Sequence, residues 1–264
     1  MSARAPSAAR IENLLRAIRN RGARAALISW AALAMLSGAC GSSGAASDGG
    51  AKGDADAGPF PPACTKQVVT KTGSEPYVIT DFSSSTDGKN VSWGFSGDTA
   101  FSGFSFAYPD AVVSDVSTGV WHLAGTVGDY SGFALGFSCA VDASMFTGVS
   151  FTIKGDAGAT GRLIMEVGTS PNDVNEATGP GSHGKCVPKA DRYDGTCASP
   201  RLDVSVTGTV NAVKLKWSDF KGGAPQASVS PDSITQLVWR FDWIAGATPF
   251  PVDITIDDVV FTVD

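Results

Sequence analysis

The sequence has few of the side chains that enzymes use as acids, bases and nucleophile partners. Only three Glu follow residue 40, and the whole chain contains two His. Glycosidases usually need two positioned carboxylates, and a Ser–His–Asp site needs a usable His. The phosphate-binding, dinucleotide-binding, zinc-protease and hydrolase-elbow motifs are also missing from the sequence. Asp is plentiful, but most of it occurs in turn-like contexts. We therefore expect no enzymatic activity.

Charge and long apolar runs are also scarce. Charged residues make up 17% of the 264 residues, and the chain after residue 39 carries 14 basic and 25 acidic side chains. Affinity for polyphosphates comes mostly from Lys and Arg, so we expect no nucleic-acid partner. The apolar run at 25–36 is 12 residues long. A membrane-spanning helix needs about 20 such residues, so this run is too short for a permanent span.

The N-terminal segment has the pattern of a secretion signal. Six Arg precede the apolar run, and small residues lead from Leu36 to Cys40. This segment resembles the lipobox of bacterial lipoproteins, although Leu36 stands four residues before the Cys rather than three. The resemblance implies a signal peptide over 1–39, a lipidated Cys40, and an exported protein anchored in the bacterial cell envelope, at the outer membrane or cell surface. Plain secretion with an unmodified Cys40 is the alternative.

A change in composition separates this signal from the rest of the chain. Residues 41–62 are almost all Gly, Ala, Ser and Asp and end in prolines. Such a segment cannot bury enough apolar surface to offset its chain entropy. We therefore predict a flexible linker over 40–63 and one globular, monomeric domain over 64–264.

The remaining cysteines predict disulfide bonds. Four Cys besides Cys40 form an even set in an exported chain, and four cysteines allow three pairings. The short loop between Cys186 and Cys197 is rich in Pro, Gly and Asp, which favours local closure. Cys64 would then pair with Cys139. Zinc sites usually contain close pairs such as CxxC, which the sequence lacks, so disulfides are favoured over a metal cluster.

The body of the chain alternates apolar and polar residues with a period of two, which is typical of strands. We predict strands at 77–82, 120–127, 132–137, 148–155, 162–168, 212–220, 236–242 and 252–261. Trp217 and Trp239 share parity with Leu and Phe, so both are expected in the core. The alternation changes phase at Asp257 and Asp258, which predicts a β-bulge. Together these strands predict an all-β domain, a sandwich of two antiparallel sheets.

Several of these segments also resemble a known superfamily. The similarity is carried mainly by CAVDASMFTGVSFTIKGDAG at 139–158, VKLKWSDF at 213–220, SPDSITQLVWRF at 230–241 and VDITIDDVVF at 252–261. They resemble galactose-binding-like jelly rolls, most of all bacterial carbohydrate-binding modules. The resemblance implies a jelly-roll fold and non-catalytic binding of a polysaccharide or other glycan. Two alternatives stay open: an envelope lipoprotein that serves as a structural or protein-interaction module, and a jelly-roll glycoside hydrolase.

Candidate sugar-binding residues follow from the strand alternation. Sugar sites combine aromatic walls with a few placed polar groups. The face opposite the core presents Glu166, Arg240 and Asp242, together with Arg162, Lys214 and Lys216. Stacking rings are expected from Trp121, Tyr130, Tyr193 and Trp243. The same charges also fit an ordinary solvated sheet face with cross-strand pairs.

The resemblance further implies a structural Ca²⁺. Related jelly rolls hold the ion with a carboxylate of the last strand and with groups near the first strand. Asp257 or Asp258 matches the last strand, and Asp81 lies on the first. Ser83 stands where the related proteins have an acidic residue. A bulged Asp pair can instead accept hydrogen bonds from its own backbone amides.

Overall fold

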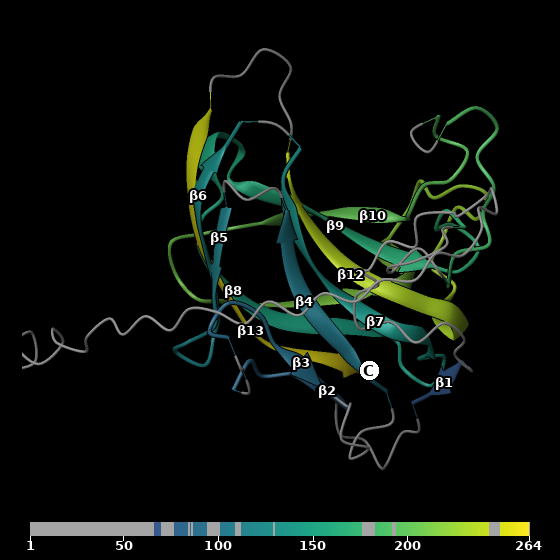
Figure 1. Ribbon diagram of the computed structural model, residues 1–264, viewed down its shortest axis with the longest axis horizontal. Helices are drawn as coiled ribbons and strands as arrows, with labels where there is room; N and C mark the ends of the chain where they lie inside the picture. The colour runs from purple at the N-terminus through teal and green to yellow at the C-terminus, as the bar shows by residue number, and fades with distance from the viewer. Residues whose placement is uncertain are drawn as a thin grey trace, which may run out of the picture. The chain divides into compact units, whose positions relative to one another are not determined.

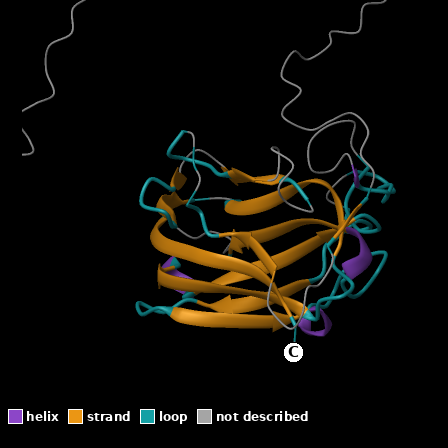
Figure 2. Cartoon of the chain, turned by 90° about the horizontal axis from the view of Figure 1, so that it is seen from below, coloured by secondary structure: helices purple, strands orange, loops and turns teal. Residues whose placement is uncertain are grey.

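The computed structural model describes most of the predicted domain, and its regular structure is almost entirely strand (Figures 1 and 2). The described residues are 66–69, 77–83, 85, 87–93, 101–108, 112–128, 130–175, 183–191, 194–242 and 249–263. The predicted signal peptide, Cys40 and the linker therefore lie outside the described residues. Within the described ranges, the helical elements are short 3-10 turns, such as Trp217–Asp219, and no helix is long and apolar enough to cross a membrane.

Thirteen described strands form two sheets. Sheet A has the order β10 (Arg201–Ser205), β9 (Arg162–Thr169), β12 (Ile234–Phe241), β7 (Gly132–Asp142), β4 (Gly103–Tyr108) and β3 (Ser92–Trp93), and the short β1 (Gln67–Val68) runs parallel to β7. Sheet B has the order β11 (Asn211–Lys216), β8 (Gly148–Asp156), β13 (Phe250–Thr262), β6 (Trp121–Val127) and β5 (Val112–Asp115), and β2 (Tyr77–Thr80) pairs with β13. Every pair except β1–β7 is antiparallel, so the predicted two-sheet antiparallel sandwich is confirmed.

Alternation along the strands places the larger apolar side chains between the sheets. Trp239 of sheet A stacks on Phe133 with ring centroids 5.6 Å apart and meets Trp121 of sheet B at 6.4 Å. Trp217 and Trp239 are both buried, as predicted. Strand β11 is shorter than expected, because Trp217 already belongs to a 3-10 turn, where its indole N–H donates to the Phe146 carbonyl at 2.9 Å.

The predicted sugar-stacking role of Trp121 is wrong. Its side chain has no exposed surface, and its ring packs against Phe82 and Phe133. The indole N–H donates a hydrogen bond to the Ser114 hydroxyl at 2.8 Å. The reason is parity: Trp121 points the same way along β6 as the fully buried Leu123, toward the core.

The predicted bulge in the last strand is confirmed. The pairing of β13 with β8 shifts register between Asp257 and Val260, and Asp258 has a φ of 52°. This left-handed backbone conformation is uncommon for residues other than Gly, and Asp is among those that adopt it most readily. The bulge lets both Ile256 and Val259 point into the core, although they are three residues apart.

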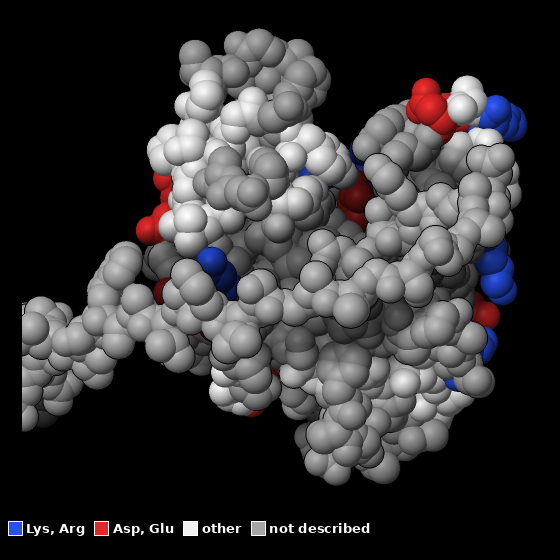
Figure 3. Space-filling model, in the orientation of Figure 1, with Lys and Arg blue, Asp and Glu red and all other residues white. Residues whose placement is uncertain are grey.

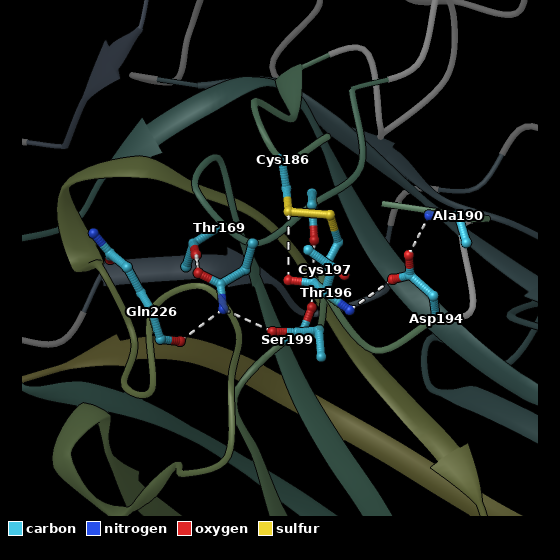
Figure 4. The surroundings of a disulfide bond; sticks show 11 residues. Thr169, Cys186, Ala190, Asp194, Thr196, Cys197, Ser199 and Gln226 are labelled. Carbon is cyan, nitrogen blue, oxygen red and sulfur yellow. Dashed lines mark hydrogen bonds between the residues drawn. A yellow bond between two sulfur atoms is a disulfide. The ribbon is translucent and has the colours of Figure 1, made fainter. Parts of the chain in front are cut away.

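One predicted disulfide is confirmed in full. Cys186 and Cys197 are bonded to each other, which closes the loop between β9 and β10 (Figure 4). Cys139 on β7 is also disulfide-bonded. Its predicted partner, Cys64, lies outside the described residues.

Candidate functional site

The candidate site lies on the side of sheet A that faces away from sheet B, which we call the outer face of sheet A. On β12, Leu237, Trp239 and Phe241 point into the core, so Arg240 and Gln236 point to the outer face. The same alternation directs Glu166 on β9, Asp203 on β10 and the aromatic residues of β4 to this face.

Arg240 and Glu166 form an ion pair at the centre of this face. The Nε and Nη2 atoms of Arg240 donate to Glu166 Oε1 at 3.1 and 2.8 Å. Only 12% of the Arg240 side chain and 19% of the Glu166 side chain are exposed. Burial alone would lower the pKa of Arg240, but the adjacent Glu166 carboxylate raises it above its ordinary value. The Arg240 guanidinium therefore stays charged in a partly desolvated place.

A second ion group continues the polar part of the site. The Nε and Nη2 atoms of Arg162 donate to Asp242 Oδ2 at 3.1 and 2.6 Å, and its Nη1 donates to Asp203 Oδ2 at 2.7 Å. Arg162 lies at the start of β9, Asp242 directly follows β12, and Asp203 lies in the middle of β10. Each carboxylate binds the guanidinium through one oxygen only. The other oxygen of each accepts no hydrogen bond from the described residues. Figure 3 shows acidic atoms at the bottom of a hollow over this part of the sheet.

Four aromatic rings follow one another beside these charges. Phe104, Phe106 and Tyr108 lie at alternate positions of β4, with ring centroids 5.7 and 6.2 Å apart, and Tyr130 stacks on Tyr108 at 5.8 Å. We call these four residues the aromatic row. The three rings of β4 are partly exposed, and Tyr130 is 52% exposed. The row is therefore available to a flat apolar ligand surface.

Small residues on the neighbouring strand β7 allow the rings to lie close to the sheet. A Cβ atom on Gly136 would lie 3.3 Å from both the Phe104 and the Phe106 ring, and one on Gly132 would lie 2.6 Å from the Tyr108 hydroxyl. Larger side chains there would push the rings away from the strand. The glycines of β7 thus set the position of the aromatic row.

The aromatic row meets the charged pair at Tyr130. The guanidinium carbon of Arg240 lies 5.3 Å from the centre of the Tyr130 ring, within the range of a cation–π contact. Burial and the neighbouring Tyr130 raise the pKa of Tyr108 above its usual range, so its hydroxyl stays protonated. Rings and charges therefore form one continuous surface across β4, β7, β12 and β9.

The structure brings together Glu166, Arg240, Asp242 and Tyr130 of the predicted sugar-binding residues. Trp243 and Tyr193 lie outside the described residues. Lys214 and Lys216 also point away from the core, but they lie on β11, which belongs to sheet B. Their outward direction agrees with the predicted alternation of the strand.

The sequence prediction missed Phe104, Phe106 and Tyr108. The signal was present as FSFAY, in which aromatic residues alternate with small ones over 104–108. In an alternating strand the larger apolar residues usually face the core, so the rings would be expected there. Instead the small residues Gly103, Ser105 and Ala107 face inward, where Trp93 covers Gly103.

The predicted calcium ligands lie near one another at the bulge of β13. The Asp81 Oδ1 atom accepts hydrogen bonds from the backbone N–H and the hydroxyl of Ser83 at 3.1 and 2.7 Å, and Asp257 Oδ1 accepts one from the Asp258 N–H at 2.8 Å. Burial, with Asp258 and Asp81 nearby, raises the pKa of Asp257. Among the described residues, no group of three or more His, Cys, Asp or Glu is placed to hold a metal ion. One oxygen of Asp81 and one of Asp257 thus accept hydrogen bonds from within the protein, and calcium stays a prediction.

No protein-family model and no curated protein matches the sequence. Among solved structures, a family 11 carbohydrate-binding module of a cellulosomal cellulase from Clostridium thermocellum matches 73% of this chain and 97% of its own, with 10% identity and a TM-score of 0.47. The same module in complex with a mixed-linked β-1,3-1,4 tetrasaccharide gives 10% identity, 73% and 98% coverage and a TM-score of 0.44. A variant of a family 29 carbohydrate-binding module gives 10% identity, 71% and 91% coverage and a TM-score of 0.38. These modules are of the kind that the sequence segments resemble.

Proposed function

We propose that the protein is a non-catalytic carbohydrate-binding protein and that the outer face of sheet A binds the polysaccharide. The observation that carries this proposal is the junction at Tyr130, where a row of partly exposed rings meets the Arg240–Glu166 ion pair. Both chemical components of a sugar site are therefore on one surface, contributed by neighbouring strands.

The aromatic row supplies the apolar component. Sugar rings present C–H groups on their faces, and these groups pack on aromatic rings, which offer a large and rigid contact area. The four centroids are spaced 5.7 to 6.2 Å apart along the row, so the surface extends over several rings rather than forming a single slot. Such a surface suits an extended chain of sugars more than one small molecule.

The charged groups supply the directional component. The arginines bind only one oxygen of each carboxylate. The other oxygens, which are Glu166 Oε2, Asp242 Oδ1 and Asp203 Oδ1, accept no hydrogen bond from the described residues. A carboxylate oxygen is a strong acceptor for a hydroxyl group, and the arginines hold these carboxylates in fixed positions. Sugar hydroxyls are donors of the required kind.

We further propose that the protein meets its glycan outside the cytoplasm as a monomer held by a lipid on Cys40. The Arg-rich start, the apolar run and the small residues before Cys40 support export. The Cys186–Cys197 disulfide also fits an oxidising compartment, because such bonds rarely persist in the cytosol. The acidic composition gives no support to a nucleic-acid partner.

Affinity electrophoresis tests the proposal. The protein is run through native gels that contain soluble β-glucans, mannans, xylans or pectins, with a gel without polysaccharide as the reference. Selective retardation by one class supports the proposal and identifies that class. Equal mobility in every gel would contradict it and favour the protein-interaction alternative. Release of reducing ends from a retained polysaccharide would favour the hydrolase instead.

A further inference from the structure

Two cross-strand rows on the outer face of sheet A have the same composition, which is a ring from β4, a glycine from β7 and a polar side chain from β12. They are Tyr108, Gly132 and Arg240 and, four residues away along β12, Phe104, Gly136 and Gln236. We call them the Arg240 row and the Gln236 row. Residues directly opposite one another in paired strands point to the same face of a sheet. The Gln236 row therefore repeats the Arg240 row, with an uncharged amide in place of the guanidinium.

Glycines on both sides of β12 position the side chains of the Gln236 row. A Cβ atom on Gly136 would lie 3.3 Å from the Phe104 ring, so this ring lies over β7. On the other side of β12, Gly168 lies opposite Gln236, and a Cβ atom there would overlap the Gln236 side chain. The partly exposed Gln236 side chain thus lies over Gly168, and no side chain of β7 stands between it and the Phe104 ring.

A buried carboxylate fixes the orientation of the Gln236 amide. The Nε2 atom of Gln236 donates to Asp173 Oδ2 at 3.4 Å, and the hydroxyl of the preceding Thr235 donates to the same oxygen. Neighbouring residues of a regular strand point to opposite faces, and the register shift of β12 between Ile234 and Gln236 lets both reach one carboxylate. Because Nε2 is the atom that faces Asp173, Gln236 Oε1 accepts no hydrogen bond from the described residues.

The Gln236 amide therefore offers an acceptor and a donor side by side. Its Oε1 atom can accept, and Nε2 carries two hydrogens, of which Asp173 takes one. Neighbouring hydroxyl groups of a sugar ring each donate and accept, so two of them match this pair. An uncharged amide also binds them without the large cost of desolvating an ion.

The surface between the two rows is apolar. Phe106 of β4, Ala134 of β7 and Val238 of β12 lie opposite one another midway between the rows. Arg240 and Gln236 are four residues apart on β12, which corresponds to roughly 13 Å of strand. A ligand that uses both rows must therefore be long and must lie along the strands. A ligand that lies across the strands would meet one row only.

We propose that Gln236 is a further sugar-binding residue and that the polysaccharide lies along β4 and β12, so that the site selects stretches long enough to span both rows. Sugar rings stack on the rings of β4, hydroxyl groups at one end bind the carboxylates beside the Arg240 row, and those at the other end bind the Gln236 amide. This inference rests on the proposed function, to which it adds the direction of the chain, its required length and a residue at its far end.

Calorimetric titration tests the length requirement. The probes are oligosaccharides of two and six sugars prepared from the β-glucans, mannans, xylans and pectins that are used in the gels. We expect the hexasaccharide of the retained class to bind at least tenfold more tightly than its disaccharide. Gln236→Leu keeps the bulk of the side chain and removes the amide, so it should weaken hexasaccharide binding at least fivefold and narrow this difference.

Two controls show that the effect of Gln236→Leu comes from the site. Asn211→Leu removes an exposed amide from β11 of sheet B and should bind both lengths like wild type. The thermal midpoint of Gln236→Leu shows whether the variant is folded, and Asp173 keeps its hydrogen bonds from Thr235 and Ser199 in it.

Amide chemical shifts of the ¹⁵N-labelled wild type give the chain direction without any variant. The hexasaccharide should shift Phe104, Gly136 and Gln236 as well as the Arg240 row. Shifts confined to the Arg240 row and its continuation through Ile164 and Asp203 would show that the chain lies across the strands. That result would overturn the inference and leave the proposed function intact.

Other results separate the two proposals in the same way. The inference is also overturned by equal binding of the two lengths, by hexasaccharide binding that Gln236→Leu leaves unchanged, or by a hexasaccharide that fails to bind although its parent polymer is retained. In each case retardation in the gels still supports polysaccharide binding. Equal mobility in every gel, with no oligosaccharide bound, would contradict the proposed function and this inference with it.

Discussion

Arg240 on β12 and Glu166 on β9 are joined by two hydrogen bonds to one carboxylate oxygen, at 3.1 and 2.8 Å, with both side chains mostly buried. The same guanidinium lies over the Tyr130 ring. A buried ion pair is weak evidence for stability, because hydrophobic residues of similar volume often stabilise a protein as well or better. Its position beside the aromatic row instead suggests that it serves ligand binding.

Replacing both members of this pair separates binding from folding. The double variant Arg240→Met and Glu166→Met should keep the free energy of unfolding within about 2 kcal/mol of wild type, since no unpaired charge is left buried. Polysaccharide affinity should fall at least tenfold. Arg240→Ala alone should cost about 2–3 kcal/mol of stability, because Glu166 then lacks its partner. Urea denaturation and affinity electrophoresis measure the two effects. A double variant that binds like wild type would show that the pair has no role in binding.

Removing one ring tests the aromatic row. Phe106→Ala should weaken polysaccharide binding about tenfold or more, which corresponds to ~1.4 kcal/mol of binding free energy. The stability cost should be about 1–2 kcal/mol, because the ring is only partly buried. Val113→Ala, at a 62% exposed position of sheet B, is the control and should change neither quantity. Undiminished affinity in calorimetric titrations of Phe106→Ala would remove the row from the site.

Buried Asp173 should make stability depend on pH. Burial raises its pKa to about 6, although Thr235, Ser199 and Gln236 donate hydrogen bonds that favour the charged form. Between about pH 4 and pH 6, the folded state therefore keeps a proton on Asp173 that the unfolded state has already released. The contribution of Asp173 to stability is therefore complete below about pH 4 and is lost as pH rises to about 6. Asp173→Asn should remove this decline.

The measurement is the difference in unfolding free energy between wild type and Asp173→Asn across pH 4 to 7. A difference is needed because Asp81, Asp87, Asp142 and Asp194 have lowered pKa values, and their contributions change with pH in the opposite direction. If the difference is constant over this range, Asp173 does not titrate as described.

Asp257 offers a test of both charge repulsion and calcium. Burial and the neighbouring Asp258 and Asp81 raise its pKa, so its contribution to stability is lost as pH rises through that value. Asp257→Asn should raise the thermal midpoint at pH 7 in EDTA, and this gain should vanish in acid. The calcium site expected from the sequence makes a further prediction. Calcium should raise the midpoint of wild type and not that of the variant, and equal midpoints in calcium and EDTA would contradict that site.

The alternation of apolar and polar residues predicted much of this architecture. The face of a sheet to which a side chain points depends on its position along its own strand, which the sequence shows directly. The alternation in QLVWRFD placed Trp239 inside and Arg240 outside, and the phase change at Asp257 and Asp258 located the bulge. The short loop between Cys186 and Cys197 likewise predicted its own disulfide. Each of these features follows from residues that are close in sequence.

The features that were not predicted depend on pairing between strands that are distant in sequence. Lys214 has the parity of a surface residue, but only the pairing of β11 with β8 assigns it to sheet B. Phe106 has the appearance of a core residue, and it faces outward because its partner strand β7 offers only small residues there. Trp121 was predicted to stack on sugars although its own strand pattern pointed inward.

Mapping the bound polysaccharide on the protein tests binding at the outer face of sheet A. Oligosaccharides of whichever polymer is retained in the gels would be titrated into the ¹⁵N-labelled protein. We expect the largest amide shifts at residues 104–108 of β4, at Tyr130, and around Glu166 and Arg240. Sheet B residues of β8 and β11 should be unaffected. Shifts centred on sheet B, with the outer face of sheet A unchanged, would show that the polysaccharide binds elsewhere.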